Sequence, residues 1–208
     1  MIQIKICGLS TPATLAAALD GGASHVGFVS FAASPRHLDA DRLAGLAASV
    51  PAHVARVGVL VDPADDVLAA IAPHLDAIQL HRTAPARVAA IRASTGRETW
   101  AAIAIKTRAD LDGARAYVGA ADRLLYDAKT PAGAALPGGM GVRFDWNLLA
   151  GFRHPLPWAL SGGLDPDNVA EAIARTNAPL VDVSSGVESA PGVKDVDKIA
   201  AFLQSARA

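Results

Sequence analysis

Short β-branched segments alternate with alanine-rich segments of helical length along the whole sequence. A strand followed by a helix, repeated many times, is typical of a parallel sheet covered by helices. Eight parallel strands, each followed by a helical segment, predict an α/β fold of the (β/α)8, or TIM barrel, type. The strands that we expect are Ile2–Ile6, His25–Val29, Val54–Val61, Ala77–Leu80, Thr99–Ile105, Arg123–Tyr126, Trp158–Leu160 and Leu180–Val183.

Helix-start signals support this assignment. Capping residues or early prolines precede the helices that we expect at Ala13–Leu19, Ala40–Ala48, Ala64–Ile71 and Asp167–Ala174. The alternative architecture is a doubly wound open sheet, which shares the alternation of strands and helices. We favour the barrel because the unusual polar residues follow strand ends, where the active sites of barrels lie.

The chain has 208 residues, near the short end of the range for such a barrel, so we expect residues 1–208 to form one catalytic domain. Hydrophobic residues make up 51% of the chain, enough to form a core and to exclude general disorder. The formal net charge is −1 and the charges are mixed, so we expect no nucleic-acid or membrane partner. Composition favours a small-molecule ligand.

Residues 1–7 alternate polar with apolar side chains and lack the continuous apolar stretch of a signal peptide. The chain has no run of about 18 apolar residues, so we expect no transmembrane helix. Cys7 is the only cysteine, which rules out an intrachain disulfide and makes a cysteine-based zinc site implausible. We therefore predict a cytoplasmic protein.

The first predicted strand has two unlike faces. Isoleucines at positions 2, 4 and 6 should pack against the helices, whereas Gln3, Lys5 and Cys7 should face the barrel interior. A charged Lys5 inside the barrel needs a carboxylate partner. Asp182 lies on the eighth strand, which neighbours the first in a closed barrel. We predict a Lys5–Asp182 pair and include Asp182 among the candidate site residues.

Cys7 ends the first strand and Asp127 ends the sixth, so both should stand at the catalytic rim. A lone cysteine is more often an inert hydrophobic residue, and an aspartate after a strand is commonly a turn former or helix cap. Asp127, however, leads into the irregular segment Ala128–Arg143, and loops of that length are usually functional. We retain Cys7 and Asp127 as candidate catalytic residues, with Gly138 and Gly139 as candidate binding residues.

Two glycine-containing turns follow the last two predicted strands. Backbone N–H groups exposed in such turns, with a short helix start behind them, form an anion site suited to phosphate. Barrels usually hold phosphate at these two loops. We therefore predict a phosphate site built by Ser161, Gly162, Gly163, Ser184, Ser185 and Gly186.

Three further polar residues are candidates for substrate binding. Arg36 lies in the loop after the second strand, where its planar guanidinium could bind a carboxylate, although an ordinary surface role is more common. Gln79 and His81 share one face of the fourth strand and should line the interior or the rim, and for His81 a satisfied hydrogen bond is the commoner role. The histidines lack metal-ligand spacing, so we expect no metal.

A series of short motifs then matches one known family in order over essentially the whole chain. The sequence resembles the phosphoribosylanthranilate isomerase family of tryptophan biosynthesis. The terminal block continues through residues 191–195 and is specific enough to set chance agreement aside. The motifs are Lys5-Ile6-Cys7-Gly8, Ser34-Pro35-Arg36, Val57-Gly58-Val59, Gln79-Leu80-His81, Gly138-Gly139-Met140-Gly141 with Phe144-Asp145-Trp146, Ser161-Gly162-Gly163-Leu164 and the block Val181–Glu188.

The resemblance implies a base at Cys7, an acid at Asp127 and a carboxylate-binding arginine at Arg36. It implies conversion of N-(5′-phosphoribosyl)anthranilate to 1-(2-carboxyphenylamino)-1-deoxyribulose 5-phosphate. This Amadori rearrangement of an aminoaldose to an aminoketose needs proton transfer and no cofactor. The implied partner is a small phosphorylated substrate, and we expect a monomer or a homodimer.

The sequence departs from the family pattern at three places. Arg82 stands where a glycine is usual, Met140 replaces a common threonine, and Ala128-Lys129 replaces small polar residues. These changes bear on loop behaviour and substrate affinity. Both proton-transfer groups also need shifted pKa values, and we expect burial to raise the pKa of Asp127 and a neighbouring positive charge to lower the pKa of Cys7.

Two alternative functions remain at this stage. The first is a related phosphate-binding barrel isomerase that performs the same rearrangement on the aminoaldose of histidine biosynthesis with two aspartates. Cys7 in the position of the base argues against it. The second is a non-catalytic barrel that binds a phosphorylated ligand as a sensor or scaffold, and the presence of both proton-transfer residues argues against that function.

Overall fold

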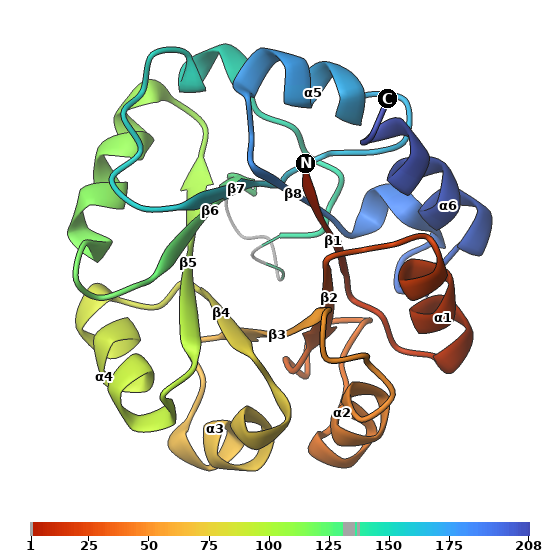
Figure 1. Ribbon diagram of the computed structural model, residues 1–208. Helices are drawn as coiled ribbons and strands as arrows, with labels where there is room; N and C mark the ends of the chain where they lie inside the picture. Colours follow the sequence, from red (N-terminus) through yellow and green to blue (C-terminus); the bar gives the residue numbers. More distant parts are fainter. Residues whose placement is uncertain (1, 131–135, 137) are drawn as a thin grey trace.

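The computed structural model describes residues 2–130, 136 and 138–208. Eight parallel strands close into a barrel in which each strand pairs with the next and the eighth pairs with the first (Figure 1). The predicted barrel is confirmed, and the open-sheet alternative is wrong. The strands are β1 (Gln3–Cys7), β2 (His25–Val29), β3 (Ala55–Val61), β4 (Ala77–His81), β5 (Glu98–Ile105), β6 (Arg123–Ala128), β7 (Trp158–Leu160) and β8 (Leu180–Val183).

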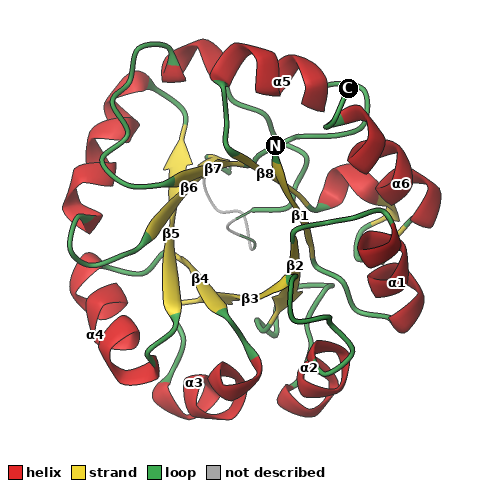
Figure 2. Ribbon diagram, viewed as in Figure 1, coloured by secondary structure: helices red, strands yellow, loops and turns green. Residues whose placement is uncertain are grey.

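Helices form the layer outside the strands (Figure 2). Each of the four predicted helices lies within two residues of its expected bounds, and the same holds for the eight strands. The α-helices are α1 (Pro12–Asp20), α2 (Ala40–Ala47), α3 (Asp65–Ile71), α4 (Pro85–Thr95), α5 (Val169–Thr176) and α6 (Val196–Ser205). The 3-10 helices are η1 (Ala72–His74), η2 (Arg108–Tyr117), η3 (Trp146–Leu149) and η4 (Ser185–Val187).

The strands beyond the eight of the barrel were not predicted. After the turn that follows β8, the chain forms a small antiparallel hairpin of β9 (Glu188–Ala190) and β10 (Val193–Lys194) before α6 begins. Pro191 and Gly192 make the turn between the two strands. The hairpin lies outside the barrel sheet, so it adds side chains at the rim without changing the barrel's closure.

The two faces of β1 separate as its alternation predicts. Ile4 and Ile6 are buried in the large apolar core, which includes side chains from the outer helices. Lys5 and Cys7 alternate with them and lie in the barrel interior, where Lys5 is completely buried. Gln3, at the N-terminal end of the strand, is exposed. The C-terminal half of β1 therefore carries the polar groups that matter to the interior.

Lys5 and Asp182 form the predicted ion pair across the closure of the barrel. Lys5 Nζ lies 2.9 Å from Asp182 Oδ1, and the two residues are direct partners in the β1–β8 register. Lys5 also donates to Gln79 Oε1 on β4 at 3.1 Å. Burial acts to lower the pKa of Lys5, but the Asp182 carboxylate and the Cys7 thiol outweigh it and the net shift is upward. Lys5 is therefore a cation inside the barrel.

Apolar side chains fill the interior toward the N-terminal ends of the strands. Trp100 is the largest of them, and Arg123 and His25 close this end by packing on its ring. The interior is therefore apolar at the N-terminal end and polar toward the carboxyl ends. The layer consists of Val57, Ala77, Trp100, Leu125, Ala159 and Leu180.

The buried pair gives a stability prediction. Lys5→Met should lower the free energy of unfolding by about 3–5 kcal/mol, because the Asp182 carboxylate would remain buried without its counter-charge. Urea denaturation followed by circular dichroism measures the loss. Arg92→Met is the control: Arg92 pairs with Asp122 at the surface, where about 0–1 kcal/mol is expected. Equal losses in both variants would contradict the assigned importance of the buried pair.

Candidate active site

A cavity of about 550 Å³ opens at the carboxyl ends of the strands. It joins a second cavity of about 350 Å³, and Asp127 lies in the wall of both. The predicted site residues in the wall of the first cavity are Cys7, Arg36, Gln79, His81, Asp127, Gly138, Gly139, Ser161, Asp182 and Ser184. Gly162, Gly163 and Ser185 line the second cavity, and Gly186 lines the space beyond it.

Cys7 is the last residue of β1 and its side chain lies in the wall of the first cavity. The cysteine is 5% exposed, so little of it reaches solvent. Burial raises the pKa of the Cys7 thiol, while the positive charges of Lys5 and Lys194 act to lower it. The net shift is upward, so the expectation of a lowered pKa is wrong in direction. Lys5 and Lys194 are the expected neighbouring cations, but the effect of burial on the Cys7 pKa outweighs theirs in the free protein.

Asp127 lies on β6, one residue before the strand ends. Its Oδ1 accepts a hydrogen bond from the backbone N–H of Ala128 at 2.8 Å. Burial, aided by the nearby negative charge of Asp182, raises the pKa of Asp127 to about 7. The expected upward shift is confirmed, and an appreciable fraction of Asp127 carries a proton at neutral pH.

A short chain of hydrogen bonds crosses the interior from Lys5 to His81. Lysine has donors only, so Gln79 must turn its Oε1 toward Lys5 and its Nε2 toward His81 Nε2, which lies 2.9 Å away. Burial lowers the pKa of His81 to about 4, so its ring is neutral. His81 Nε2 therefore accepts from Gln79, and the ring proton resides on Nδ1.

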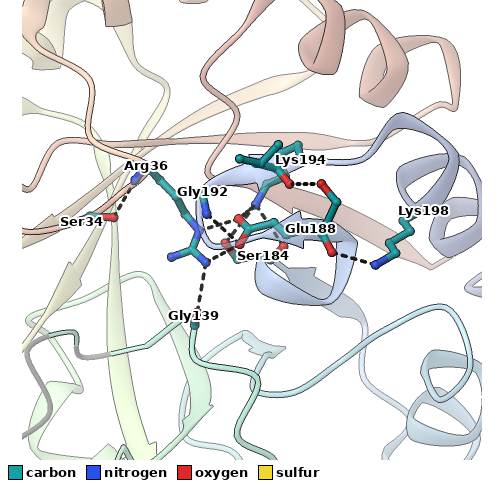
Figure 3. A network of polar contacts seen from close by, with 10 residues as sticks. Ser34, Arg36, Gly139, Ser184, Glu188, Gly192, Lys194 and Lys198 are labelled. Atoms are coloured by element: carbon teal, nitrogen blue, oxygen red, sulfur yellow. Dashed lines mark hydrogen bonds and ion pairs between the residues drawn. The ribbon is translucent and has the colours of Figure 1, made fainter.

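Arg36 reaches the rim from the loop after β2. Its Nε and Nη2 each donate to a carboxylate oxygen of Glu188 at 2.7 Å, and Nη2 also donates to the carbonyl of Gly139 at 3.1 Å (Figure 3). The arginine is 5% exposed and lines the first cavity. The predicted surface alternative is therefore wrong: Arg36 is a buried, fixed cation in the wall of the site.

The two glycine-containing turns have backbone amides at the second cavity and at the space beyond it. Among the described residues, no hydrogen bond of the structure uses the backbone N–H groups of Gly162, Gly163, Ser185 or Gly186 as donors. Such groups at a turn and at the start of a 3-10 helix can bind an anion. The arrangement fits the predicted phosphate site.

Two glycines are required for close approaches in these turns. Gly162 has φ +89°, and a Cβ there would lie 2.5 Å from the backbone nitrogen of Ala128 and 3.0 Å from Asp127 Oδ1. A Cβ on Gly186 would collide with the carbonyl of Leu164. The turn after β7 thus packs directly behind the acid on β6, and the turn after β8 packs against the turn after β7.

The loop Ala128–Arg143 is described only in part, and residues 131–135 and 137 lie outside the described residues. Of its predicted binding residues, Gly138 lies against Asp127, since a Cβ there would be 2.4 Å from Asp127 Oδ2. Gly139 offers its carbonyl to Arg36. The loop therefore meets both the acid and the arginine.

Sequence reasoning missed two charged groups and one apolar surface. Glu188 and Lys194, on the unpredicted hairpin, are both buried beside Arg36. The sequence signal that could have indicated this pair is a glutamate and a lysine on either side of the Pro191-Gly192 turn. Val29, Phe31 and Val59 pack with Cys7 as an apolar wall of the first cavity, which the sequence analysis did not single out.

One departure from the family pattern has a backbone explanation. Arg82 adopts φ +51°, a left-handed conformation that favours the glycine usual at this position. The bend that follows β4 is therefore kept despite the substitution. Met140 is 47% exposed on the glycine-containing loop and lines the second cavity.

Over residues 2–130, 136 and 138–208, no three His, Cys, Asp or Glu side chains are grouped in a way that would hold a metal ion. Within the same residues, no helix is long and apolar enough to cross a membrane.

A closed (β/α)8 barrel with an acid, a thiol and two glycine turns at its carboxyl rim defines a class, the barrel isomerases that work by proton transfer. Residues 4–205 match the family model described as N-(5′-phosphoribosyl)anthranilate (PRA) isomerase. The chain therefore belongs to the N-(5′-phosphoribosyl)anthranilate isomerase family, as its sequence motifs predicted. The comparisons favour this activity, in tryptophan biosynthesis, over the histidine-pathway isomerase and over a non-catalytic barrel.

Individual relatives agree over the full length. An N-(5′-phosphoribosyl)anthranilate isomerase of Zymomonas mobilis subsp. pomaceae is 53% identical over 209 residues, covering 99% of this chain and 98% of the relative. A crystal structure of monomers of the dimeric enzyme from Thermotoga maritima superposes with TM-score 0.84 at 32% identity, covering 100% and 99% of the two chains. A structure in complex with reduced 1-(o-carboxyphenylamino)-1-deoxyribulose 5-phosphate gives TM-score 0.83 at 29% identity, covering 100% and 99%.

The raised pKa of Cys7 gives a prediction for thiol chemistry. Iodoacetamide should alkylate Cys7 slowly at neutral pH, and the rate should rise with pH along a titration whose midpoint lies above the ordinary thiol value of about 8.5. Mass spectrometry counts one adduct per chain, and an activity assay follows inactivation. Cys7→Ala should resist the reagent. Full activity after stoichiometric alkylation would show that Cys7 is not needed for catalysis.

Proposed function

We propose that Cys7 is the general base and Asp127 the general acid of N-(5′-phosphoribosyl)anthranilate isomerisation in this chain. The observation that carries the proposal is the position of Asp127 in the wall of both cavities, with Cys7 in the first and the glycine turns at the second. A sugar that links an aromatic amine to a phosphate would place its ring between the two cavities, next to Asp127. Both proton transfers then fall within reach of the two residues.

The reaction divides into two proton transfers. Asp127 protonates the furanose ring oxygen, the bond from C1′ to that oxygen breaks, and the nitrogen lone pair forms a protonated imine. The Cys7 thiolate then removes the proton from C2′, whose bonding electrons form the C1′–C2′ double bond while the imine electrons return to nitrogen. The resulting enolamine tautomerises to the ketose. Every step is a proton transfer or an electron-pair shift within the substrate, so no cofactor is called for.

The two ends of the substrate differ in chemistry, and so do the two cavities. The apolar wall of Val29, Phe31 and Val59 suits an aromatic ring, and Arg36 supplies a cation for its carboxylate. The free amides of the turns after β7 and β8 suit the phosphate. We assign Ser161, Gly162, Gly163, Ser184, Ser185, Gly186, Gly138 and Gly139 to this binding surface.

Gln79, His81 and Asp182 have supporting roles in the proposal. The neutral His81 ring keeps a proton on Nδ1 and can donate to a hydroxyl of the open sugar. Asp182 holds Lys5 and raises the pKa of Asp127, which keeps the acid protonated. Lys5 and Lys194 oppose the effect of burial on Cys7 and so favour its thiolate.

We further propose that residues 1–208 act as one catalytic domain in the cytoplasm. A single cysteine fits a reducing compartment. The relative from Thermotoga maritima is dimeric, which supports a homodimer for this chain, with a monomer as the alternative.

Asp127→Asn tests the acid. The substitution keeps the shape of the side chain but removes its proton, so kcat should fall by roughly 10²–10⁴ while KM changes little. Loss of the anthranilate-bearing substrate, followed by fluorescence with purified protein, measures both constants. Asp122→Asn is the control, because Asp122 is a surface aspartate paired with Arg92. Near-normal kcat in the Asp127 variant would require another acid.

Ser185→Asp tests the phosphate site. A carboxylate beside the free amides should repel the substrate phosphate and raise KM strongly, with a smaller effect on kcat. Ser185 is preferable to Gly162 because any side chain at Gly162 would also strike Asp127 and Ala128. Ser94→Asp on the outer helix α4 is the control and should leave KM unchanged. An unchanged KM in the Ser185 variant would place the phosphate elsewhere.

A further inference from the structure

Two buried charged residues have no part in the reaction as derived above. Glu188 is the first residue of β9 and Lys194 the last of β10, and each is 8% exposed. Their side chains form an ion pair with a short Nζ–Oε1 distance of 2.5 Å. Burying two charges at the rim is costly unless each is well paired. Glu188 contacts Arg36, and Lys194 contacts Glu188.

Glu188 holds Arg36 along one whole edge of the guanidinium. Nε donates to Oε1 and Nη2 donates to Oε2, both at 2.7 Å, so the contact is bidentate (Figure 3). A bidentate pair fixes the plane of a guanidinium as well as its position. The glutamate itself is fixed from behind by the backbone N–H of Gly192, at 3.1 Å from Oε2, and by Lys194. Arg36 is therefore held by a rigid partner.

The donors of Arg36 can be counted. A guanidinium has five N–H groups. Glu188 takes one from Nε and one from Nη2, and the carbonyl of Gly139 takes the second from Nη2. Among the residues that the structure describes, neither N–H group on Nη1 has an acceptor. Because Arg36 lines the first cavity and Glu188 does not, the remaining nitrogen is the one available to a ligand there.

Lys194 is committed to the network in a different way. Its three donors go to Glu188 Oε1 and to the carbonyl and hydroxyl oxygens of Ser184. The lysine thus has no donor left for a ligand among its described contacts. Its charge balances Glu188, so the Arg36 charge is not cancelled. The cluster of Arg36, Glu188 and Lys194 carries one net positive charge, which one carboxylate would neutralise.

We propose that Glu188 is a positioning residue for substrate binding: it orients Arg36 so that Nη1 meets the carboxylate on the aromatic ring of the substrate. The inference rests on the proposed role of Arg36. Glu188 touches no substrate atom and acts through the guanidinium. Lys194 keeps Glu188 ionised and leaves the positive charge of Arg36 for the ligand. The hairpin β9–β10 is thus part of the binding machinery for the aromatic end.

A double-mutant cycle tests the inference, with KM and kcat for the anthranilate-bearing substrate as one readout and the Kd of inorganic phosphate as the other. Glu188→Gln should raise KM about tenfold with kcat within about twofold, because it disturbs ground-state binding of the carboxylate. The Kd of phosphate should not change. Arg36→Met should raise KM at least as much, and Glu188→Gln should add little in that background.

Asp76→Asn is the matched control. Asp76 holds Arg56 in the same bidentate manner, with distances of 2.8 and 2.7 Å, but near the N-terminal ends of β3 and β4. Its KM should equal that of the unmodified protein. If Glu188→Gln proves too unstable to purify, Glu188→Asp keeps the charge beside Lys194 but shortens the reach to Arg36, and KM should again rise.

Three results would overturn the inference. If Arg36→Met raises KM while the Glu188 variants do not, Arg36 needs no positioning by Glu188. If Glu188→Gln raises KM equally with and without Arg36, Glu188 does not act through the arginine. If Arg36→Met leaves KM unchanged, the proposed role of Arg36 itself fails and the inference falls with it, while the assignments of Cys7 and Asp127 stand on their own tests.

Discussion

The buried ion pair of Lys5 and Asp182 is the interaction on which the site depends. It lies where β1 meets β8, the closure of the barrel, and it brings a positive and a negative charge into a space without solvent. From this pair the polar interior is built outward: Lys5 fixes Gln79, Gln79 fixes the ring of His81, and Asp182 raises the pKa of Asp127. The pair therefore orients Gln79 and His81 and adds to the effect of burial on the pKa values of Asp127 and Cys7.

Burial raises the pKa of both the proposed acid, Asp127, and the proposed base, Cys7. Burial favours the neutral form of each group, which is the form required of an acid but not of a base. For Asp127, burial and Asp182 act in the same direction. For Cys7, Lys5 and Lys194 oppose burial without overcoming it. In the free protein Asp127 is thus closer to the protonated form that an acid needs than Cys7 is to the thiolate that a base needs. Lys5 and Lys194 stabilise the minor thiolate form of Cys7.

Much of this arrangement was predictable from the sequence, because strand alternation assigns each residue to a face and parallel strands end on one rim. Lys5, Asp182, Cys7 and Asp127 could all be placed on that basis. The direction of the Cys7 pKa shift could not, since it depends on how much solvent reaches the thiol. The contact of Arg36 with Glu188 was also beyond prediction, because it joins residues 152 positions apart through a hairpin whose pairing has no strong local signal.

The segment that follows β8 has a geometric consequence. Ser185 and Gly186, which we propose bind the phosphate, are separated by one residue from Glu188, which we propose orients Arg36. The two proposed anchors for the substrate thus lie on one short, well-packed stretch of backbone, so they cannot shift independently. The distance between the proposed phosphate site and Arg36 is therefore fixed. A ligand whose two charged groups are spaced differently could bind at one of these two places but not at both. The segment of residues 185–188 would therefore select ligands by the distance between their charged groups.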